Sequence, residues 1–257
     1  MALVEVDHLT VRFGGLTAIN DLSFTVEEGS ITALIGPNGA GKTTAFNCLT
    51  GFYKPTEGDV RFNGTSLTPL KPHEITALGI MRTFQNVRLF KRMSVTENVM
   101  SGLHSVTKQS VFGALFHPPA QKREEAFIRK EAMESMAFTG IAELGDSIAQ
   151  DLPYGLQRRV ELARAIAPHP RLVLLDEPAA GLNDVEKEEL MALIRRCRDE
   201  LGITVFLIEH DMDLIMNLAE KIVVISFGSK IAEGEPEAIK NDSVVIEAYL
   251  GSEDEPA

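Results

Sequence analysis

The sequence of 257 residues has few cysteines and no long apolar segment. Cys48 and Cys197 are its only cysteines, and two thiols so placed fit neither a disulfide framework nor the spacing of a metal site. No run of roughly 18 apolar residues occurs, so we expect no membrane-spanning helix. Residues 1–5 also lack the basic and apolar regions of a signal peptide. We therefore expect a cytoplasmic protein.

Positive charge is in the minority as well. The chain has 25 lysines and arginines against 37 aspartates and glutamates, and its net charge is −12 at pH 7. Broad binding to nucleic acid favours a basic surface, so nucleic acid is not an expected partner. The hydrophobic content of 44% is ordinary for a globular protein, and the length allows either one large domain or two small ones.

The most informative stretch is residues 36–44, with the sequence GPNGAGKTT. It follows the apolar residues 31–35, which predict a buried strand, and it precedes the predicted start of a helix at residues 45–49. Glycines let the backbone wrap around an anion, and the helix N-terminus adds positive potential. An ordinary glycine-rich turn is the alternative, but the order of strand, loop and helix favours a phosphate-binding loop.

This loop predicts specific contacts to a nucleotide. Lys42 places a point charge on the outer phosphates, and the Thr43 hydroxyl is positioned to bind Mg²⁺. The full set of residues expected to bind ATP here is Asn38, Gly39, Ala40, Gly41, Lys42, Thr43 and Thr44.

The rest of the chain indicates an α/β core with a helical insertion. Period-two apolar spacing at residues 4–6, 22–26 and 60–62 predicts antiparallel strands. Residues 94–167 are mostly helical in pattern, with a break at residues 116–119. The apolar runs 172–175, 204–208 and 222–225 predict parallel strands covered on both faces, with a crossover helix at residues 184–200.

One helix of the insertion has a mixed charge pattern. Residues 121–138 predict a helix on which Ala126, Met133 and Ala137 share one apolar face. We expect its charged residues to form a solvated surface and not a site.

Polar side chains follow two of the predicted parallel strands. Asp176 and Glu177 come directly after residues 172–175, and His210 follows residues 204–208. Ligands of parallel α/β sheets bind at the carboxyl ends of the strands. Asp176 therefore suits a metal site, Glu177 can polarise an attacking water, and His210 can contact the γ-phosphate. The alternative is a merely solvated strand end.

Two further residues are weak signals on their own. Gln85 ends another predicted strand and opens the helical insertion, which places it at the same edge. Phe13 could stack on an adenine ring, but composition alone makes it equally a core residue.

Together these residues resemble the ATP-binding subunit of an ABC transporter, over nearly the whole chain. The motifs in chain order are Phe13 as the A-loop aromatic, residues 36–44 as Walker A, Gln85 as the Q-loop, residues 152–159 as the signature, Asp176 with Glu177 as Walker B and its base, residues 180–183 as the D-loop, and His210 as the switch histidine. The resemblance implies an α/β P-loop NTPase core of the ABC type with an antiparallel β subdomain and a helical subdomain. It implies one domain over residues 1–257, with the core at 1–84 and 168–257 and the insertion at 85–167.

The resemblance also implies chemistry and cofactors. The substrate would be ATP with Mg²⁺, and the chain would be an ATPase. Glu177, His210 and Gln85 would act in hydrolysis, while Thr43, Gln85 and Asp176 would organise the metal.

More narrowly, the chain resembles the LivG-type ATPases of branched-chain (hydrophobic) amino acid importers. The stretches that indicate this class are residues 154–155, 178–183, 208–212 and 231–251, together with the long insertion at 108–131. The class implies two transmembrane permease subunits, a second ATPase that is a LivF-like paralogue or another copy of this chain, and an external substrate-binding protein. It also implies a peripheral position on the cytoplasmic face of the inner or plasma membrane, with a permease helix docked near Gln85.

The signature departs from the family pattern. Pro153, Tyr154 and Leu156 replace the usual Ser, first Gly and Gln of Leu-Ser-Gly-Gly-Gln. In the family this segment contacts the ATP held by the partner subunit, and the resemblance places Pro153, Gly155, Gln157 and Asn183 in that role. Since Pro153 has neither hydroxyl nor N–H, the Gly155 N–H and the helix N-terminus must carry the contact. One charge-assisted hydrogen bond contributes about 1.5–3 kcal/mol, so the partner site could be weaker. Asn183 stands where an aspartate is common.

Two other classes of function are alternatives. A soluble ABC ATPase acting on ribosomes or DNA usually has two cassettes or a long coiled coil, whereas this chain has one cassette, no sustained heptads and an acidic balance. A small-molecule P-loop kinase would need an acceptor pocket, and the signature-like segment and His210 argue against it.

Overall fold

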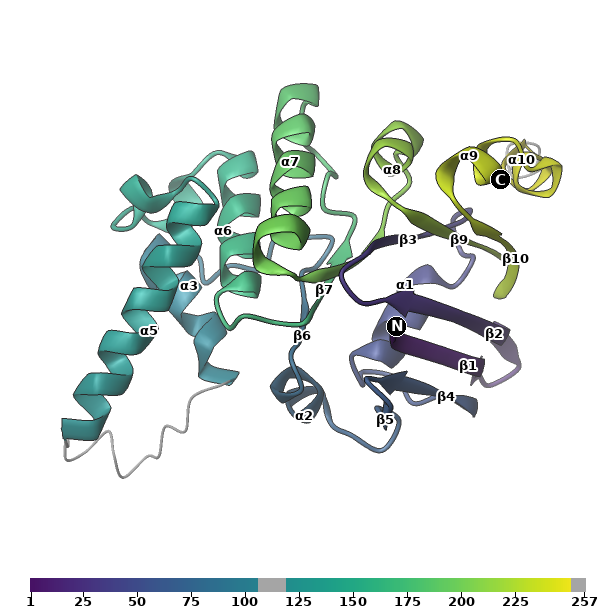
Figure 1. Ribbon diagram of the computed structural model, residues 1–257, viewed down its shortest axis with the longest axis horizontal. Helices are drawn as coiled ribbons and strands as arrows, with labels where there is room; N and C mark the ends of the chain where they lie inside the picture. Colours follow the sequence, from purple (N-terminus) through teal and green to yellow (C-terminus); the bar gives the residue numbers. More distant parts are fainter. Residues whose placement is uncertain (106–118, 251–257) are drawn as a thin grey trace.

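The computed structural model describes residues 1–105 and 119–250, which form two sheets surrounded by helices (Figure 1). The smaller sheet is antiparallel and has the order β2-β1-β4-β5. Its strands are β1 (Ala2–Phe13), β2 (Leu16–Glu27), β4 (Glu57–Phe62) and β5 (Thr65–Ser66). Val4 is paired with Val26 on one side and with Phe62 on the other. The antiparallel strands predicted at residues 4–6, 22–26 and 60–62 are therefore confirmed.

The larger sheet has the order β10-β9-β3-β8-β7-β6. Its strands are β3 (Ile31–Ile35), β6 (Ile80–Arg82), β7 (Leu172–Asp176), β8 (Thr204–Ile208), β9 (Lys221–Ser226) and β10 (Ser229–Gly234). All neighbours are parallel except β9 and β10. Every residue of β3, β7 and β8 is buried, which explains their continuous apolar sequences. Because these three strands are parallel neighbours, their carboxyl ends meet at one edge.

Helices and the smaller sheet cover the two faces of the larger sheet. On one face, α1 (Lys42–Leu49) packs between the sheets, and the Phe46 ring lies 5.0 Å from the Phe206 ring. The other face is covered by α7 (Asp184–Leu201), α8 (Met212–Leu218), α9 (Pro236–Lys240) and α10 (Ser243–Leu250), with part of α6 (Tyr154–Ile166). The predicted crossover helix is thus α7, which joins β7 to β8.

The helical region lies at the end of the molecule away from the antiparallel sheet (Figure 1). It contains α3 (Val95–Gly102), α5 (Pro119–Phe138) and α6, with single 3₁₀ turns at Leu103–Ser105, Ala142–Leu144 and Ala149–Asp151. The short helix α2 (Pro72–Ala77) precedes β6. A separate apolar core joins α3, α5 and α6, with Val99, Ala132 and Val160 at its centre. None of the helices in residues 1–105 and 119–250 is long and apolar enough to cross a membrane.

The prediction for the apolar face of α5 was wrong. Ala126, Met133 and Ala137 are exposed, and the buried residues are instead Ile128, Glu131, Ala132, Ser135 and Met136. The buried face contains the polar residues Glu131 and Ser135, so the spacing of apolar residues did not identify it. Glu131 Oε2 lies 2.5 Å from His169 Nε2, and the Ser135 hydroxyl donates to the Glu131 carbonyl oxygen at 2.9 Å. The predicted break at residues 116–119 can be compared with the structure only at Pro119, where α5 begins. Residues 116–118 lie outside the described residues.

Candidate nucleotide-binding site

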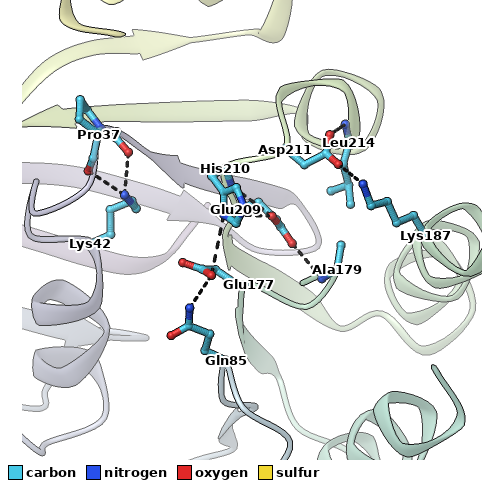
Figure 2. A network of polar contacts seen from close by, with 11 residues as sticks. Pro37, Lys42, Gln85, Glu177, Ala179, Lys187, Glu209, His210, Asp211 and Leu214 are labelled. Carbon is cyan, nitrogen blue, oxygen red and sulfur yellow. Dashed lines mark hydrogen bonds and ion pairs between the residues drawn. The ribbon is translucent and has the colours of Figure 1, made fainter. Parts of the chain in front are cut away.

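The predicted phosphate-binding loop joins β3 to α1. Lys42 is the first residue of α1, is 9% exposed, and its Nζ donates to the carbonyl oxygens of Gly36 at 2.6 Å and Pro37 at 2.9 Å (Figure 2). Burial lowers the pKa of Lys42, while the charges of Glu177 and Asp176 oppose that effect. The two oxygens that accept hydrogen bonds from the Lys42 ammonium belong to uncharged carbonyl groups. A bound phosphate would give this buried ammonium a hydrogen-bonded partner of opposite charge.

Glycines allow the close packing of this loop. Gly41 adopts φ +102° at the N-cap of α1, and a Cβ there would lie 2.6 Å from the Ala18 carbonyl oxygen. A Cβ on Gly36 would collide with the Ile225 carbonyl oxygen. Asn38 and Gly39 are exposed at the turn, and Ala40 is buried with its N–H donated to Pro37 O at 3.2 Å. The loop therefore has the compact shape that an anion-binding backbone requires.

Asp176 lies at the carboxyl end of β7 with an arginine partner. Its Oδ2 accepts a hydrogen bond from the Arg82 guanidinium at 2.7 Å, and both side chains are 7% exposed. Arg82 also donates to Asn47 Oδ1 at 2.7 Å, and its guanidinium carbon lies 5.1 Å from the centre of the Phe84 ring. Arg82 therefore connects the strand β6 to both Asp176 and α1.

The three residues predicted to bind Mg²⁺ line one cavity. Thr43, Gln85 and Asp176 border a hollow of about 400 Å³. Their hydroxyl, amide and carboxylate oxygens are hard ligands of the kind that Mg²⁺ prefers alongside substrate phosphates. Within the described part of the chain, no group of three or more His, Cys, Asp or Glu side chains could hold a metal ion. Three such oxygens fit an Mg²⁺ ion that shares its coordination with a bound nucleotide.

Glu177, Gln85 and His210 converge at this edge of the sheet (Figure 2). Gln85 Nε2 donates to Glu177 Oε2 at 2.7 Å, and His210 Nδ1 lies 3.8 Å from the same oxygen. Glu177 has a left-handed backbone at φ +47°, a conformation that costs a non-glycine residue about 1–3 kcal/mol. Its N–H donates to the Ile208 carbonyl oxygen at 2.9 Å. Hydrogen bonds thus hold the Glu177 carboxylate, on a strained backbone, between the ends of β6, β7 and β8.

Phe13 lies beside the same cavity. Its side chain is 45% exposed, so the alternative that it is a core residue is wrong. Its ring centre lies 5.1 Å from that of Tyr53 in an edge-on contact, and Tyr53 borders the cavity of Thr43 and Asp176. An exposed aromatic pair at this position suits a purine ring.

The signature residues form a separate group. Pro153 caps α6, and Gln157 Nε2 donates to the Leu152 carbonyl oxygen at 2.8 Å. A Cβ on Gly155 would collide with the Glu186 side chain. Glu186 forms a capping box with Asn183, in which the Glu186 N–H donates to Asn183 Oδ1 at 3.0 Å. The start of α6 therefore packs against the start of α7. This group is separate from Lys42, Glu177 and His210, which lie at the edge of the larger sheet.

Arg158 is a functional candidate that the sequence analysis missed. Its side chain is 3% exposed, and its guanidinium donates to the carbonyl oxygens of Phe84, at 2.8 Å, and Gln85. It also pairs with the buried Glu161 at 3.2 Å, where burial raises the pKa of the Glu161 carboxyl. The i,i+3 spacing of Arg158 and Glu161 was the available signal. Arg82 and Glu209 were missed too. Each lies close to a recognised motif residue, Gln85 or His210, but no pattern in the sequence marks either of them as functional.

Comparisons with known proteins agree with this geometry. The family model described as ABC transporter matches residues 19–180, and the one described as branched-chain amino acid ATP-binding cassette transporter matches residues 229–255. The chain belongs to the ABC transporter family. The predicted family and fold class are confirmed, and the chain binds nucleotide and is an ATPase.

Its relatives are similar over nearly their whole length. The high-affinity branched-chain amino acid transport ATP-binding protein BraF of Pseudomonas aeruginosa is 48% identical, over 97% of this chain and 98% of that protein. The corresponding protein LivG of Salmonella typhimurium is 45% identical over the same shares. Among solved structures, the ADP conformation of MJ1267, an ATP-binding cassette of an ABC transporter, has a TM-score of 0.85 and 32% identity, covering 98% of this chain and 99% of that one.

Proposed function

We propose that this chain is the ATP-hydrolysing subunit of an importer for branched-chain amino acids. The observation that carries the proposal is the convergence of Gln85, Glu177 and His210 beside the Lys42 loop, in a chain almost half identical to BraF. BraF and LivG are both named as transport ATP-binding proteins, which favours this function over action on ribosomes or DNA. The chain would energise two membrane permease subunits from a peripheral position on the cytoplasmic face, with an external binding protein delivering the substrate.

Each residue of the sheet edge has a role in hydrolysis. Lys42 and the loop N–H groups hold the β- and γ-phosphates, and the Phe13 ring faces the adenine. Thr43, Gln85 and Asp176 would hold Mg²⁺, which neutralises charge on the phosphate oxygens when it is bound.

Glu177 acts as the general base. It takes a proton from the water whose oxygen attacks the γ-phosphorus, and the bond from that phosphorus to the β–γ bridging oxygen breaks. His210 and Gln85 orient the Glu177 carboxylate, and His210 also contacts the γ-phosphate as negative charge shifts to ADP.

The signature group serves the nucleotide of a second ATPase subunit. Pro153, Gly155, Gln157 and Asn183 lie at the starts of α6 and α7, and two helix N-termini favour an anion. The ATP-binding cassette MJ0796, which is 25% identical with a TM-score of 0.75, was solved as a dimer bound to ADP and Pi. That dimer supports pairing of this chain with a LivF-like paralogue or with a second copy of itself.

Gentle purification of the tagged chain from its native membranes, with mass-spectrometric identification of its partners, tests the proposal. We expect two polytopic membrane proteins and a second ATPase subunit to co-purify, and the complex to bind and transport leucine, isoleucine or valine. Recovery only from the soluble fraction, together with ribosomal or DNA-repair proteins, would contradict the transport function and leave the ATPase assignment intact.

A further inference from the structure

Glu209 is a buried carboxylate that none of the roles above uses. It follows the last residue of β8, precedes His210, and is 1% exposed. Both of its oxygens accept main-chain hydrogen bonds: Oε1 from the Ala179 N–H at 2.8 Å and Oε2 from the His210 N–H at 3.0 Å (Figure 2). Its side chain therefore bridges the chain beyond β7 and the chain beyond β8.

The chemistry of this bridge requires a carboxylate. An ionised carboxylate only accepts hydrogen bonds, so each oxygen can take one N–H. A glutamine of the same shape has one acceptor oxygen and one donor NH₂, so it would leave one of the two N–H groups facing another donor. Glu209 thus supplies one double acceptor at a place where two main-chain N–H groups need it.

The two N–H groups belong to the segments that carry the base and the histidine. Ala179 lies in the turn after Glu177, which is closed by the Ala180 N–H donating to the Glu177 carbonyl oxygen at 3.2 Å. The Glu177 N–H in turn donates to Ile208, just before Glu209. The ends of β7 and β8 are therefore tied twice, and the separation of the His210 ring from the Glu177 carboxylate depends on both ties.

A further contact, from the other side of His210, reaches the first turns of α7. Asp211 caps α8, with its Oδ1 accepting from the Leu214 N–H, and its Oδ2 pairs with Lys187 on α7. The residues on both sides of His210 thus hold the segment that runs from Ala179 into α7. A displacement of this segment would be transmitted to the histidine.

We propose that Glu209 is a positioning residue that holds His210 against Glu177 and couples its position to the turn of residues 178–183. The proposal rests on the proposed roles of Glu177 and His210 and adds a link from the start of α7 to the hydrolytic centre. Glu209 itself touches no reacting atom, so it acts entirely through its two main-chain partners.

A double-mutant cycle tests this coupling in the complex purified from membranes. We expect Glu209→Gln to keep ATP affinity within about twofold and to lower kcat about tenfold, since one hydrogen bond to a charged group is lost. We expect His210→Ala to lower kcat about 100-fold, and the double variant to be no more than about twofold slower than His210→Ala alone. If the falls in kcat of the two single variants multiply in the double variant, the proposal is overturned. That result would mean that Glu209 has a merely structural role, independent of His210.

The cycle separates this inference from the proposed function. Hydrolysis near the wild-type rate in His210→Ala would contradict the proposed role of His210, whatever Glu209 does. Glu200→Gln is the matched control, because Glu200 is an exposed partner of Arg196, and its kcat should equal that of the wild type. Should Glu209→Gln fail to fold, Glu209→Asp keeps the charge but is one methylene too short to reach both N–H groups. In the same cycle, the variant that combines Glu209→Asp with His210→Ala must then be no more than about twofold slower than His210→Ala alone. Falls in kcat that multiply would again overturn the proposal.

Discussion

The sheet edge and the helical region of this protein place functional residues in different ways. At the edge, Lys42, Glu177 and His210 lie in the segments that follow three neighbouring parallel strands, and each is held by hydrogen bonds or close polar contacts within the same chain. In the helical region, Gly155 presents backbone at the start of α6, and its surroundings come from α7. We infer that the first arrangement binds a nucleotide on this chain, whereas the second would contact a nucleotide held by another subunit.

From this difference we expect binding and hydrolysis to be separable in this chain. The sheet edge contains the cation, the carboxylates and the histidine, so the nucleotide affinity of the isolated chain should depend on this edge. The start of α6 contributes N–H groups and a helix terminus, so it should affect hydrolysis only when a second subunit is present. Variants in the two regions should therefore affect different measurements.

The largest expected effect is that of Glu177→Gln. We expect hydrolysis in the purified complex to fall about 10²–10⁴-fold, the range for loss of a positioned base, with ATP affinity retained. Phosphate release and equilibrium binding of ATP, measured on the same sample, check this. Glu125→Gln, an exposed glutamate on α5, is the control. A Glu177→Gln complex that hydrolyses ATP near the wild-type rate would remove Glu177 from the role of base.

Lys42→Ala should weaken nucleotide binding itself. Its buried ammonium contributes one charge-assisted contact to phosphate in a desolvated loop, so we expect the Kd for ATP to rise about 100-fold. Calorimetric titration of the isolated chain measures this, with the exposed Lys240→Ala as the control. Unchanged affinity in Lys42→Ala would contradict the assignment of the phosphate-binding loop.

Two methionines on α5 test the packing of the helical region. Met136 is fully buried and Met133 is 40% exposed. We expect Met136→Ala to lower the free energy of unfolding by about 2–5 kcal/mol and Met133→Ala by less than about 0.5 kcal/mol. Denaturant titration of both variants checks the difference. Equal losses would mean that the buried face of α5 differs from the one described.

The smallest expected effect is that of Gly155→Ala. The added Cβ would displace the Glu186 side chain and disturb the capping box of α7. We expect hydrolysis by the complex to fall about tenfold while the isolated chain binds ATP as before, because one hydrogen-bonded contact to the partner's nucleotide is weakened. Gly234→Ala, where a Cβ meets only ordinary contact distances, is the control. A loss of ATP affinity in the isolated Gly155→Ala chain would contradict the separation of the two regions.

The sequence predicted the sheet edge well because its signals are local. Residues 31–35, 172–175 and 204–208 are continuous apolar runs, and parallel strands bring whatever follows them to one edge. The contacts of Arg82 and Arg158 could not be predicted, because Asp176 is 94 residues from Arg82 and the Gln85 carbonyl is 73 residues from Arg158. On α5, hydrogen-bonded polar residues within the buried stripe disguised the helical period.

We expect that one chain binds ATP but needs a second cassette to hydrolyse it. The most direct test measures ATP affinity and hydrolysis per molecule in the same preparation, first alone and then with increasing amounts of the second ATPase subunit from the same membranes. We predict that the chain binds ATP when alone, and that hydrolysis per molecule rises with the second subunit, or with the chain's own concentration if it pairs with itself. A hydrolysis rate per molecule that is independent of both would show a complete site within one chain and contradict the need for a second cassette.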